Sequence, residues 1–382
     1  MYSLSGTKIS DEYALLSISD VHLLHPKTPT RHIANNFVKY VLNESTLRGV
    51  KLFVIAGDFY DREGVFHDDD VQTTIELVAN IIKVCAMFDI VLRVLKGTPW
   101  HDRDQSINFI TIAKVLGLPV DVKYIETIEI ETIESLGISV LYVPDEVNYD
   151  TAVTLKQVRA LMESRGFEQV DYAVMHGLFD FQVPEVISPH IKHDTQAYLK
   201  MVSKNIVIGH DHHMQTNGRI GINGSFDRLA HNEEHPKGFL KIHVRPYGNE
   251  WEFVENKGAL PYVTYKVYTD DLEVSLEKLF KKVEKLPAGS HVRVLTTRAN
   301  PMFNALTSLK VNYPLLHWKI ESKEKKVTQI TQTSLPKQKH KPIAITKETL
   351  PALIKENLLI DRSGESGFTM DDVLSRLTEL SR

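Results

Sequence analysis

Short apolar runs alternate with longer amphipathic stretches from the start of the chain to about Val244. The helical stretches include residues 33–44 and 70–88, where apolar positions recur at helical spacing. The apolar runs have the length of strands, are rich in Val, Ile and Leu, and are YALLSIS, KLFVIAG, IVLRVLKG, ISVLYVP, DYAVMHG and NIVIGH. This alternation predicts an α/β domain whose strands are buried on both faces.

A second, smaller pattern follows from Pro261 to Ile320. It consists of a strand (YVTYKVY), a helix (LEVSLEKLFKKVEKL) and a strand (HVRVLTT), and a further helix is expected near Asn304. This pattern predicts a compact α+β unit. A lysine-rich, proline-broken stretch comes next and is typical of a flexible linker. Thr346 then begins a helical tail.

Composition and charge restrict the function classes only in part. The net charge of -4 gives no support for nucleic-acid binding, so an anionic substrate would need a local basic patch or bound cations. The single cysteine, Cys85, lies in an apolar stretch, which excludes an internal disulfide framework and fits a reducing, cytoplasmic location. No apolar run reaches the roughly 18 residues of a membrane span, and the N-terminus lacks the pattern of a secretory signal. We therefore expect a soluble, intracellular protein without membrane contact.

Side chains that bind metals cluster where the predicted strands end. Five strand ends carry them: Asp20 and His22; Asp58 and Asp61; His101 and Asp102; His176; His210, His212 and His213. The carboxyl ends of parallel strands meet in one crevice, which is where α/β folds place their sites. Carboxylates mixed with imidazoles suit Mn, Fe or Zn, and Asp58 is the candidate bridge between two ions.

Each of these signals alone has an ordinary structural explanation. A single Asp after a strand often caps a helix, and a single His is more often a core or surface residue than a ligand. Five successive strand-like segments that all end in Asp or His groups are not expected by chance. The combined pattern therefore predicts a metal site.

The order DxH, GDxxD, HD, HG and GHxH resembles the calcineurin-like metallophosphoesterase superfamily over about the first 240 residues. The resemblance implies a four-layer αββα sandwich and two divalent metal ions, with Mn as the expected metal. It further implies that His101 is the catalytic histidine, oriented by Asp102. One ion would be held by Asp20, His22, Asp58 and His212, and the other by Asp58, His176 and His210.

The third motif departs from the superfamily pattern. The superfamily usually has Gly-Asn-His-Asp there, with the Asn oxygen on the second metal, whereas this chain has Gly97-Thr98-Pro99-Trp100-His101-Asp102. The Thr98 hydroxyl, a backbone carbonyl or water would have to replace the missing ligand.

The segment after the last metal motif resembles that of SbcD-type nucleases. Its shared residues are Gly224, Ser225, Arg228, Glu233 or Glu234, and Lys237-Gly238-Phe239. This resemblance implies a Mn-dependent DNA exonuclease and endonuclease for repair or recombination, acting as a homodimer with an SbcC-type coiled-coil ATPase. The third motif is similar to phage-encoded members, for which the location would be the host cytoplasm.

The resemblance also assigns the parts of the chain. We expect a nuclease domain at 1–250, a DNA-capping α+β domain at 251–320, a basic linker at 321–345 and a partner-binding helical tail at 346–382. Arg62, Arg103 and Arg228 are candidate DNA contacts, and solvated surface arginines are the ordinary alternative.

Two other functions stay open on the sequence. A phosphoprotein phosphatase or small-molecule phosphodiesterase would share the metal motifs but would not need the second unit or the tail. A degraded phosphoesterase fold that serves as a binding scaffold would explain the missing Asn, but not the retained Asp and His residues.

Overall fold

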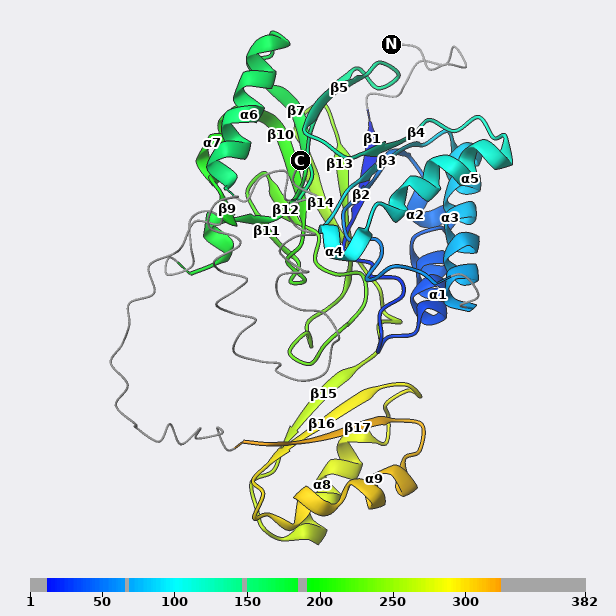
Figure 1. Ribbon diagram of the computed structural model, residues 1–382, viewed down its shortest axis with the longest axis vertical. Coiled ribbons are helices and arrows are strands. Elements are labelled where there is room, and N and C mark those ends of the chain that lie inside the picture. Colours follow the sequence, from blue (N-terminus) through cyan, green and yellow to red (C-terminus); the bar gives the residue numbers. More distant parts are fainter. Residues whose placement is uncertain (1–11, 66–68, 146–149, 185–190, 324–382) are drawn as a thin grey trace, which may run out of the picture. The chain divides into compact units, whose positions relative to one another are not determined.

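The computed structural model describes residues 12–65, 69–145, 150–184 and 191–323 (Figure 1). The chain divides into two compact units, Met1–Lys325 and Lys326–Arg382. The second unit lies outside the described residues. The predicted helical tail at 346–382 and all but the first three residues of the predicted linker at 321–345 lie there as well.

The first of two large sheets has four parallel strands in its centre and on one side. Its strands, in spatial order, are β14 (Glu250–Glu255), β13 (Gly238–Val244), β1 (Tyr13–Ile18), β2 (Val50–Ala56), β3 (Val91–Leu95) and β4 (Val122–Ile125). Strands β1 to β4 run parallel, whereas β13 pairs antiparallel with β1 and β14 antiparallel with β13.

The second large sheet is built in a similar way. Its strands, in spatial order, are β11 (Gln215–Asn217), β12 (Ile220–Ile222), β10 (Val202–Gly209), β7 (Val170–His176), β6 (Ile138–Val143) and β5 (Glu129–Ile133). The four middle strands are parallel, and the two edge strands are antiparallel to their neighbours. A separate pair, β8 (Leu178–Phe179) and β9 (Lys192–His193), lies nearby in sequence.

Three clusters of buried apolar side chains show how these elements pack. On β2, Phe53 and Ile55 join the cluster under the helices of the first sheet, while Leu52, Val54 and Ala56 join a cluster shared with the second sheet. A third cluster packs the other face of the second sheet against its helices. Alternate residues of a strand point to opposite faces, so strands buried on both faces read as continuous apolar runs. The predicted mixed α/β fold is confirmed.

The helices lie on the outer faces of the two sheets (Figure 1). Asp150 and Asp194 cap α6 and α7 by accepting from backbone N–H groups, which satisfies donors that the first helical turn leaves free. The first sheet carries α1 (Thr30–Tyr40), α2 (Glu44–Leu47), α3 (Asp69–Phe88) and α5 (Asn108–Leu116), and the second carries α6 (Thr151–Ser164) and α7 (Thr195–Met201). The short α4 (Pro99–Asp102) instead lies among the loops that follow the strands of the first sheet.

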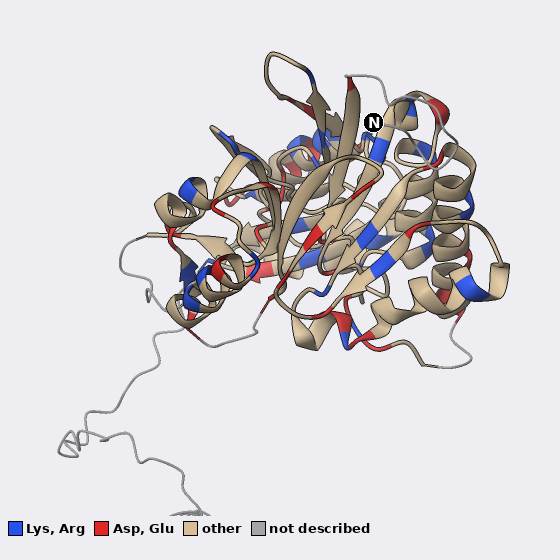
Figure 2. Cartoon of the chain, turned by 90° about the horizontal axis from the view of Figure 1, so that it is seen from above, with Lys and Arg blue, Asp and Glu red and all other residues tan. Residues whose placement is uncertain are grey.

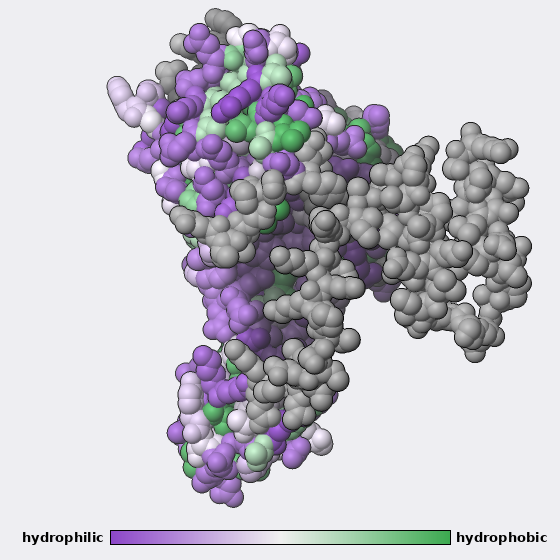
Figure 3. Space-filling view, turned by 60° about the vertical axis from the view of Figure 1, so that its left-hand side comes forward, coloured by the Kyte–Doolittle hydropathy of each residue, from purple (hydrophilic) through white to green (hydrophobic). Residues whose placement is uncertain are grey.

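Helix α3 is the one helix in the described residues that is long and apolar enough to cross a membrane by length and composition alone. One face of this helix, including Leu77, Ile81 and Cys85, is buried in the cluster under the first sheet. The helix therefore packs as a core helix of an α/β domain. Figure 3 shows most of the visible surface as hydrophilic, with hydrophobic residues in scattered patches, as is ordinary for a protein surface.

Residues 262–322, called the smaller unit from here on, lie within Met1–Lys325 and have a sheet and a core of their own. Three parallel strands, β15 (Tyr262–Lys266), β16 (His291–Thr296) and β17 (His317–Ser322), pack with α8 (Leu272–Val283) and α9 (Leu306–Asn312) around Leu279, Val292 and Leu309. The predicted boundary at residue 250 needs a correction. Strand β14 pairs with β13 along its whole length, so residues through Glu255 belong to the first large sheet.

Candidate metal centre

The loops that follow β1 and β2 hold three of the predicted ligands side by side. Backbone hydrogen bonds continue beyond the strands, from Asp20 N to Gly57 O (3.2 Å) and from His22 N to Asp58 O (3.1 Å). Asp20, His22 and Asp58 all have positive φ values, of 50°, 51° and 49°. Non-glycine residues rarely adopt this conformation, and such residues cluster at functional sites.

The ends of strands from both large sheets supply one connected set of metal-capable groups. In the described residues, three groups have ligand atoms within 4.8 Å of one another: Asp20, His22 and His212; Asp58, His176 and His210; His22, Asp58 and His101. Asp58 Oδ2 lies 4.0 Å from His22 Nε2 and 3.4 Å from His176 Nε2. The structure therefore brings all six predicted metal ligands together, with Asp58 between the two halves.

The imidazole rings are turned so that their Nε2 atoms face the cluster. Three rings place Nδ1 against an oxygen: His176 against Ala56 O (2.8 Å), His212 against Glu233 Oε1 (3.0 Å) and His22 against Asp61 Oδ1 (3.0 Å). The contacts of His176 and His212 are hydrogen bonds that fix the tautomer in which Nε2 carries a lone pair, as in histidines that bind metals, whereas the His22–Asp61 pair lies close without hydrogen-bond geometry. His22 Nε2 and His212 Nε2 are 3.2 Å apart. Ligands about 2.1 Å from one ion have similar spacing.

The electrostatics of the cluster fit a cation. Burial acts to raise the pKa of Asp58, but the charges of neighbouring imidazoles, His176 first, outweigh it and hold the pKa well below its ordinary value. Burial acts to lower the pKa of His176, but the Asp58 carboxylate raises it well above its ordinary value. These two shifts report one favourable pair, Asp58 with His176, whereas burial and the neighbouring His176 lower the pKa of His210. The mixed nitrogen and oxygen donors fit Mn, Fe or Zn.

Two positions next to the candidate ligands His176 and Asp58 have no room for a side chain, and both are glycines. Gly57 has a φ of 87°, and a Cβ at this position would overlap the His176 ring. A Cβ at Gly97 would overlap Asp58. The close approach of backbone to ligand therefore requires glycine at both positions.

The predicted role of Asp102 is wrong in its geometry. Asp102 is fully buried and accepts hydrogen bonds from Tyr60 N (3.2 Å) and Gly97 N (2.8 Å), so it braces the loops and does not hold His101. Burial, together with the Asp58 carboxylate, raises the pKa of Asp102 to about 6. His101 Nδ1 instead lies 3.0 Å from the carbonyl oxygen of Asp61. Asp61 therefore orients both His22 and His101.

Sequence reasoning missed Asp145, Glu233 and Lys237 as parts of the centre. Asp145 Oδ2 lies 3.1 Å from Thr98 Oγ1, and the buried Lys237 ammonium lies 2.9 Å from Glu233, which holds His212. Asp145 directly follows the run ISVLYVP, so a sixth strand end carried the same signal as the other five. Glu233 and Lys237 stood only in the segment that resembles SbcD-type nucleases, where nothing linked them to His212.

The remaining predicted residues lie outside the metal cluster. Arg62 Nε donates to Leu24 O, and the exposed Arg103 lies 3.5 Å from Glu63. Arg228 donates to Ala259 O and His235 O, so its guanidinium group braces backbone, and its role as a DNA contact stays a prediction. His213 contacts His235, with ring centroids 4.4 Å apart and the ring planes tilted by 51°.

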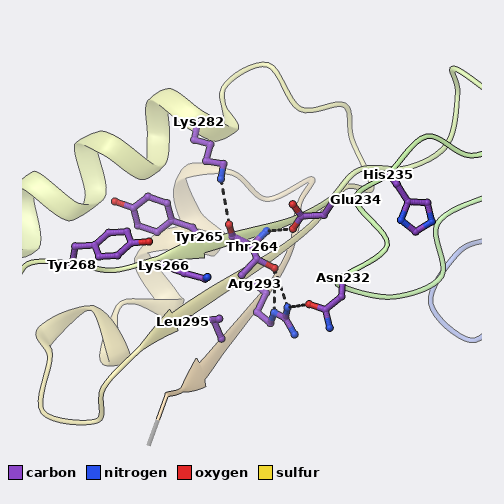
Figure 4. Close-up of a pocket in the computed structure, with 10 residues that line it drawn as sticks. All are labelled: Asn232, Glu234, His235, Thr264, Tyr265, Lys266, Tyr268, Lys282, Arg293 and Leu295. Carbon is purple, nitrogen blue, oxygen red and sulfur yellow. Dashed lines mark hydrogen bonds between the residues drawn. The ribbon is translucent and has the colours of Figure 1, made fainter. Parts of the chain in front are cut away.

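An open pocket of about 800 Å³ lies between the loop at residues 231–235 and the smaller unit. Figure 4 shows Arg293 donating to Asn232 (2.8 Å) and Glu234 accepting from Thr264 N (3.1 Å). Its lining is Asn232, Glu234, His235, Thr264, Tyr265, Lys266, Tyr268, Lys282, Arg293 and Leu295. Two lysines, an arginine and two tyrosines against one carboxylate make it a basic, aromatic surface. Elsewhere, basic and acidic residues are interspersed (Figure 2).

Comparisons with known proteins do not identify a family. No family model matches the chain, and no curated protein matches it. Among solved structures 46 chains match, and one of them, a crystal structure, has a TM-score of 0.36 and 9% identity over 64% of this chain and 99% of that chain. A likeness at that level carries no inference about activity. The function must therefore be inferred from the geometry of the chain itself.

Proposed function

We propose that this chain is a two-metal, Mn-dependent phosphodiesterase that cleaves DNA near its ends. One observation carries the proposal: Asp58 lies between two groups of carboxylates and imidazoles that come from the strand ends of both large sheets. A binding scaffold would have no need to hold Asp20, His22 and Asp58 at positive φ values. Nor would it need the Nε2 atoms of His22 and His176 to face Asp58.

Different residues of the centre have different roles in the proposed hydrolysis. When bound, divalent cations supply the charge that neutralises a phosphodiester and favours hydroxide over water near neutral pH. Asp58 holds the two halves of the centre together. His101 is half-exposed beside the cluster, and its Nδ1 contact with Asp61 leaves Nε2 available to protonate the departing sugar oxygen. Asp61 is then the positioning residue for this histidine.

The pocket beside the centre favours a polynucleotide over a small phosphate ester. Lys266 and Lys282 are exposed on its wall, where they can meet backbone phosphates. Tyr268 is also exposed there, with the Lys323 ammonium 5.2 Å from its ring centroid, and we expect it to stack with a base. The loop at 231–235 connects the two sites, because Glu233 contacts His212 and the neighbouring Glu234 bonds to Thr264. We expect a strand of nucleic acid to contact both.

The homodimer, the SbcC-type ATPase partner and the cytoplasmic location belong to the same proposal. Their basis is the resemblance of the sequence to SbcD-type nucleases, and the tail expected to bind the ATPase lies outside the described residues.

The test compares wild type with Asp58→Asn on 5′- and 3′-labelled duplex DNA in Mn, with an aryl phosphate ester as the rival substrate. We expect nucleotide release by wild type, and a loss of at least 100-fold in Asp58→Asn, because the shared ligand is weakened. Asp171→Asn is the matched control, since Asp171 bonds to Ser139 and Lys204 away from the centre. Ester cleavage without DNA cleavage would favour a phosphatase, and absence of bound metal would favour the scaffold.

A further inference from the structure

The second half of the metal centre has fewer donors than an ion requires. Asp58, His176 and His210 supply one ligand atom each. Zn, Mn and Fe ions in proteins take four or more donors, so a group of three needs at least one more from the protein or from solvent. The question is which atom of this chain lies where that donor belongs.

The Thr98 hydroxyl has the position of a neighbouring ligand. Thr98 is buried, and its Oγ1 lies 3.2 Å from Asp58 Oδ2 and 3.5 Å from His176 Nε2. Two ligands bonded at about 2.1 Å to one ion and at right angles to each other are separated by about 3 Å. Thr98 N also donates to Asp58 Oδ1 (2.6 Å), which holds the two residues in register.

The hydroxyl is also turned away from its ordinary partner. Thr98 is the N-cap of α4, and a Thr at this position usually accepts a hydrogen bond from a backbone N–H of the first helical turn. Its side chain makes no such bond here, although its carbonyl accepts from His101 N and Asp102 N. The side chain faces the cluster in place of the helix.

Asp145 accounts for that orientation. Its Oδ2 lies 3.1 Å from Thr98 Oγ1 and reaches the centre from the end of β6. A hydroxyl has one hydrogen to donate, and donation to Asp145 leaves its lone pairs free for an ion beside Asp58 and His176. A carboxylate that accepts this hydrogen also makes the oxygen a stronger donor, as carboxylates do behind metal-binding histidines.

We propose that Thr98 Oγ1 is a ligand of the cation held by Asp58, His176 and His210, and that Asp145 positions and polarises this hydroxyl. The inference deepens the proposed function and rests on it. It assigns Asp145 a role that none of the sequence motifs gave it.

The test measures Mn binding to the full-length chain by titration calorimetry and by the electron paramagnetic resonance signal of a spin-coupled Mn pair. Thr98→Val keeps the shape of the side chain and removes the oxygen, whereas Thr98→Ser keeps the oxygen. We expect Thr98→Val and Asp145→Asn to weaken one of two equivalents by about 10- to 100-fold. Thr98→Ser should retain both equivalents. Thr74→Val, which removes a buried hydroxyl bonded to Asp70 O in α3, is the matched control.

The outcomes separate this inference from the proposed function. Wild type that binds no divalent cation would overturn both. Wild type and Thr98→Val that bind two equivalents with equal affinity, and give the same coupled signal, would overturn the inference alone. If Thr98→Val does not fold, Asp145→Asn decides: an unchanged second equivalent overturns the assignment, and a weakened one supports it.

Discussion

At the scale of single residues, the backbone around the cluster is held in conformations that cost free energy. Asp20, His22, Asp58 and His210 all have positive φ values. Non-glycine residues in such regions cost on the order of 1 kcal/mol or more each, and they persist only where the surrounding structure fixes them. Here the fixing contacts are the backbone bonds between the loops after β1 and β2. The strain therefore lies at the candidate ligands.

His101 allows a sharp prediction at this scale. In His101→Gln we expect DNA cleavage to fall by about 100-fold or more, because the general acid is lost, with both equivalents of Mn retained. Metal analysis of the purified variant, together with the cleavage assay, checks this. His101 also lies within ligand distance of His22 and Asp58. Loss of metal in the variant would therefore make it a ligand and contradict its role as an acid.

At the scale of elements, the strands of the two large sheets that the sequence predicted are buried on both faces. The six apolar runs correspond to β1, β2, β3, β6, β7 and β10, all of them interior strands. Strands β14 and β17, with the sequences EWEFVE and HWKIES, were missed because they are half-buried and carry charged residues between apolar ones. A strand with one solvated face has no continuous apolar run to signal it.

For the candidate site, the sequence predicted the metal-capable residues but not the side chains that hold them in place. Residue types after strands marked the ligands, because chain order alone brings them to one edge. The partners of those ligands depend on which loops meet in space. Asp61 lies far in sequence from both His22 and His101, and Glu233 lies far from His212 in the same way. Proximity in sequence wrongly favoured Asp102 as the partner of His101.

An ion pair between the two sheets provides the prediction for this scale. The buried Arg93 of β3 donates to both carboxylate oxygens of Glu131 on β5, at 2.8 and 2.9 Å. Burial acts to raise the pKa of Glu131, but Arg93 outweighs it and holds the pKa below its ordinary value. The stabilisation is therefore complete above the ordinary value and is lost as pH falls through the lowered one.

Glu131→Gln removes this dependence. At pH 7 we expect the variant to lose about 2 kcal/mol of unfolding free energy, because Arg93 exchanges a bidentate carboxylate for a neutral amide and keeps only Asp121 as a charged partner. The difference from wild type should shrink as pH falls below about 4.5, where the unfolded carboxyl takes up a proton. Urea unfolding from pH 7 to 3.5 measures it, with Glu76→Gln on the exposed side of α3 as the control. A difference that does not change with pH would show that Glu131 stabilises through packing alone.

At the scale of the whole molecule, one short loop connects the metal centre with the smaller unit. Within residues 231–235, Glu233 holds His212, Asn232 accepts from Arg293, and Glu234 accepts from Thr264 N. His235 of the same loop also contacts the metal centre, with its Nε2 2.9 Å from the backbone oxygen of His212. The basic pocket and the candidate metal centre therefore both contact this one loop.

The centre also joins the two large sheets, because Asp20 and Asp58 follow strands of the first and His176 and His210 follow strands of the second. Cations that bind only the folded chain stabilise it by RT ln(1 + [L]/Kd), which is about 2.7 kcal/mol at a concentration 100 times Kd. We expect chelator-treated protein to unfold at lower urea concentration than protein in Mn, and Asp58→Asn to lose most of that difference. Asp171→Asn should keep this difference between chelated and Mn-bound protein, since the Asp171 carboxylate pairs with Lys204 away from the candidate ligands. If Mn stabilised Asp58→Asn as much as wild type, the ions would be bound elsewhere, and the contact between the two sheets would not depend on them.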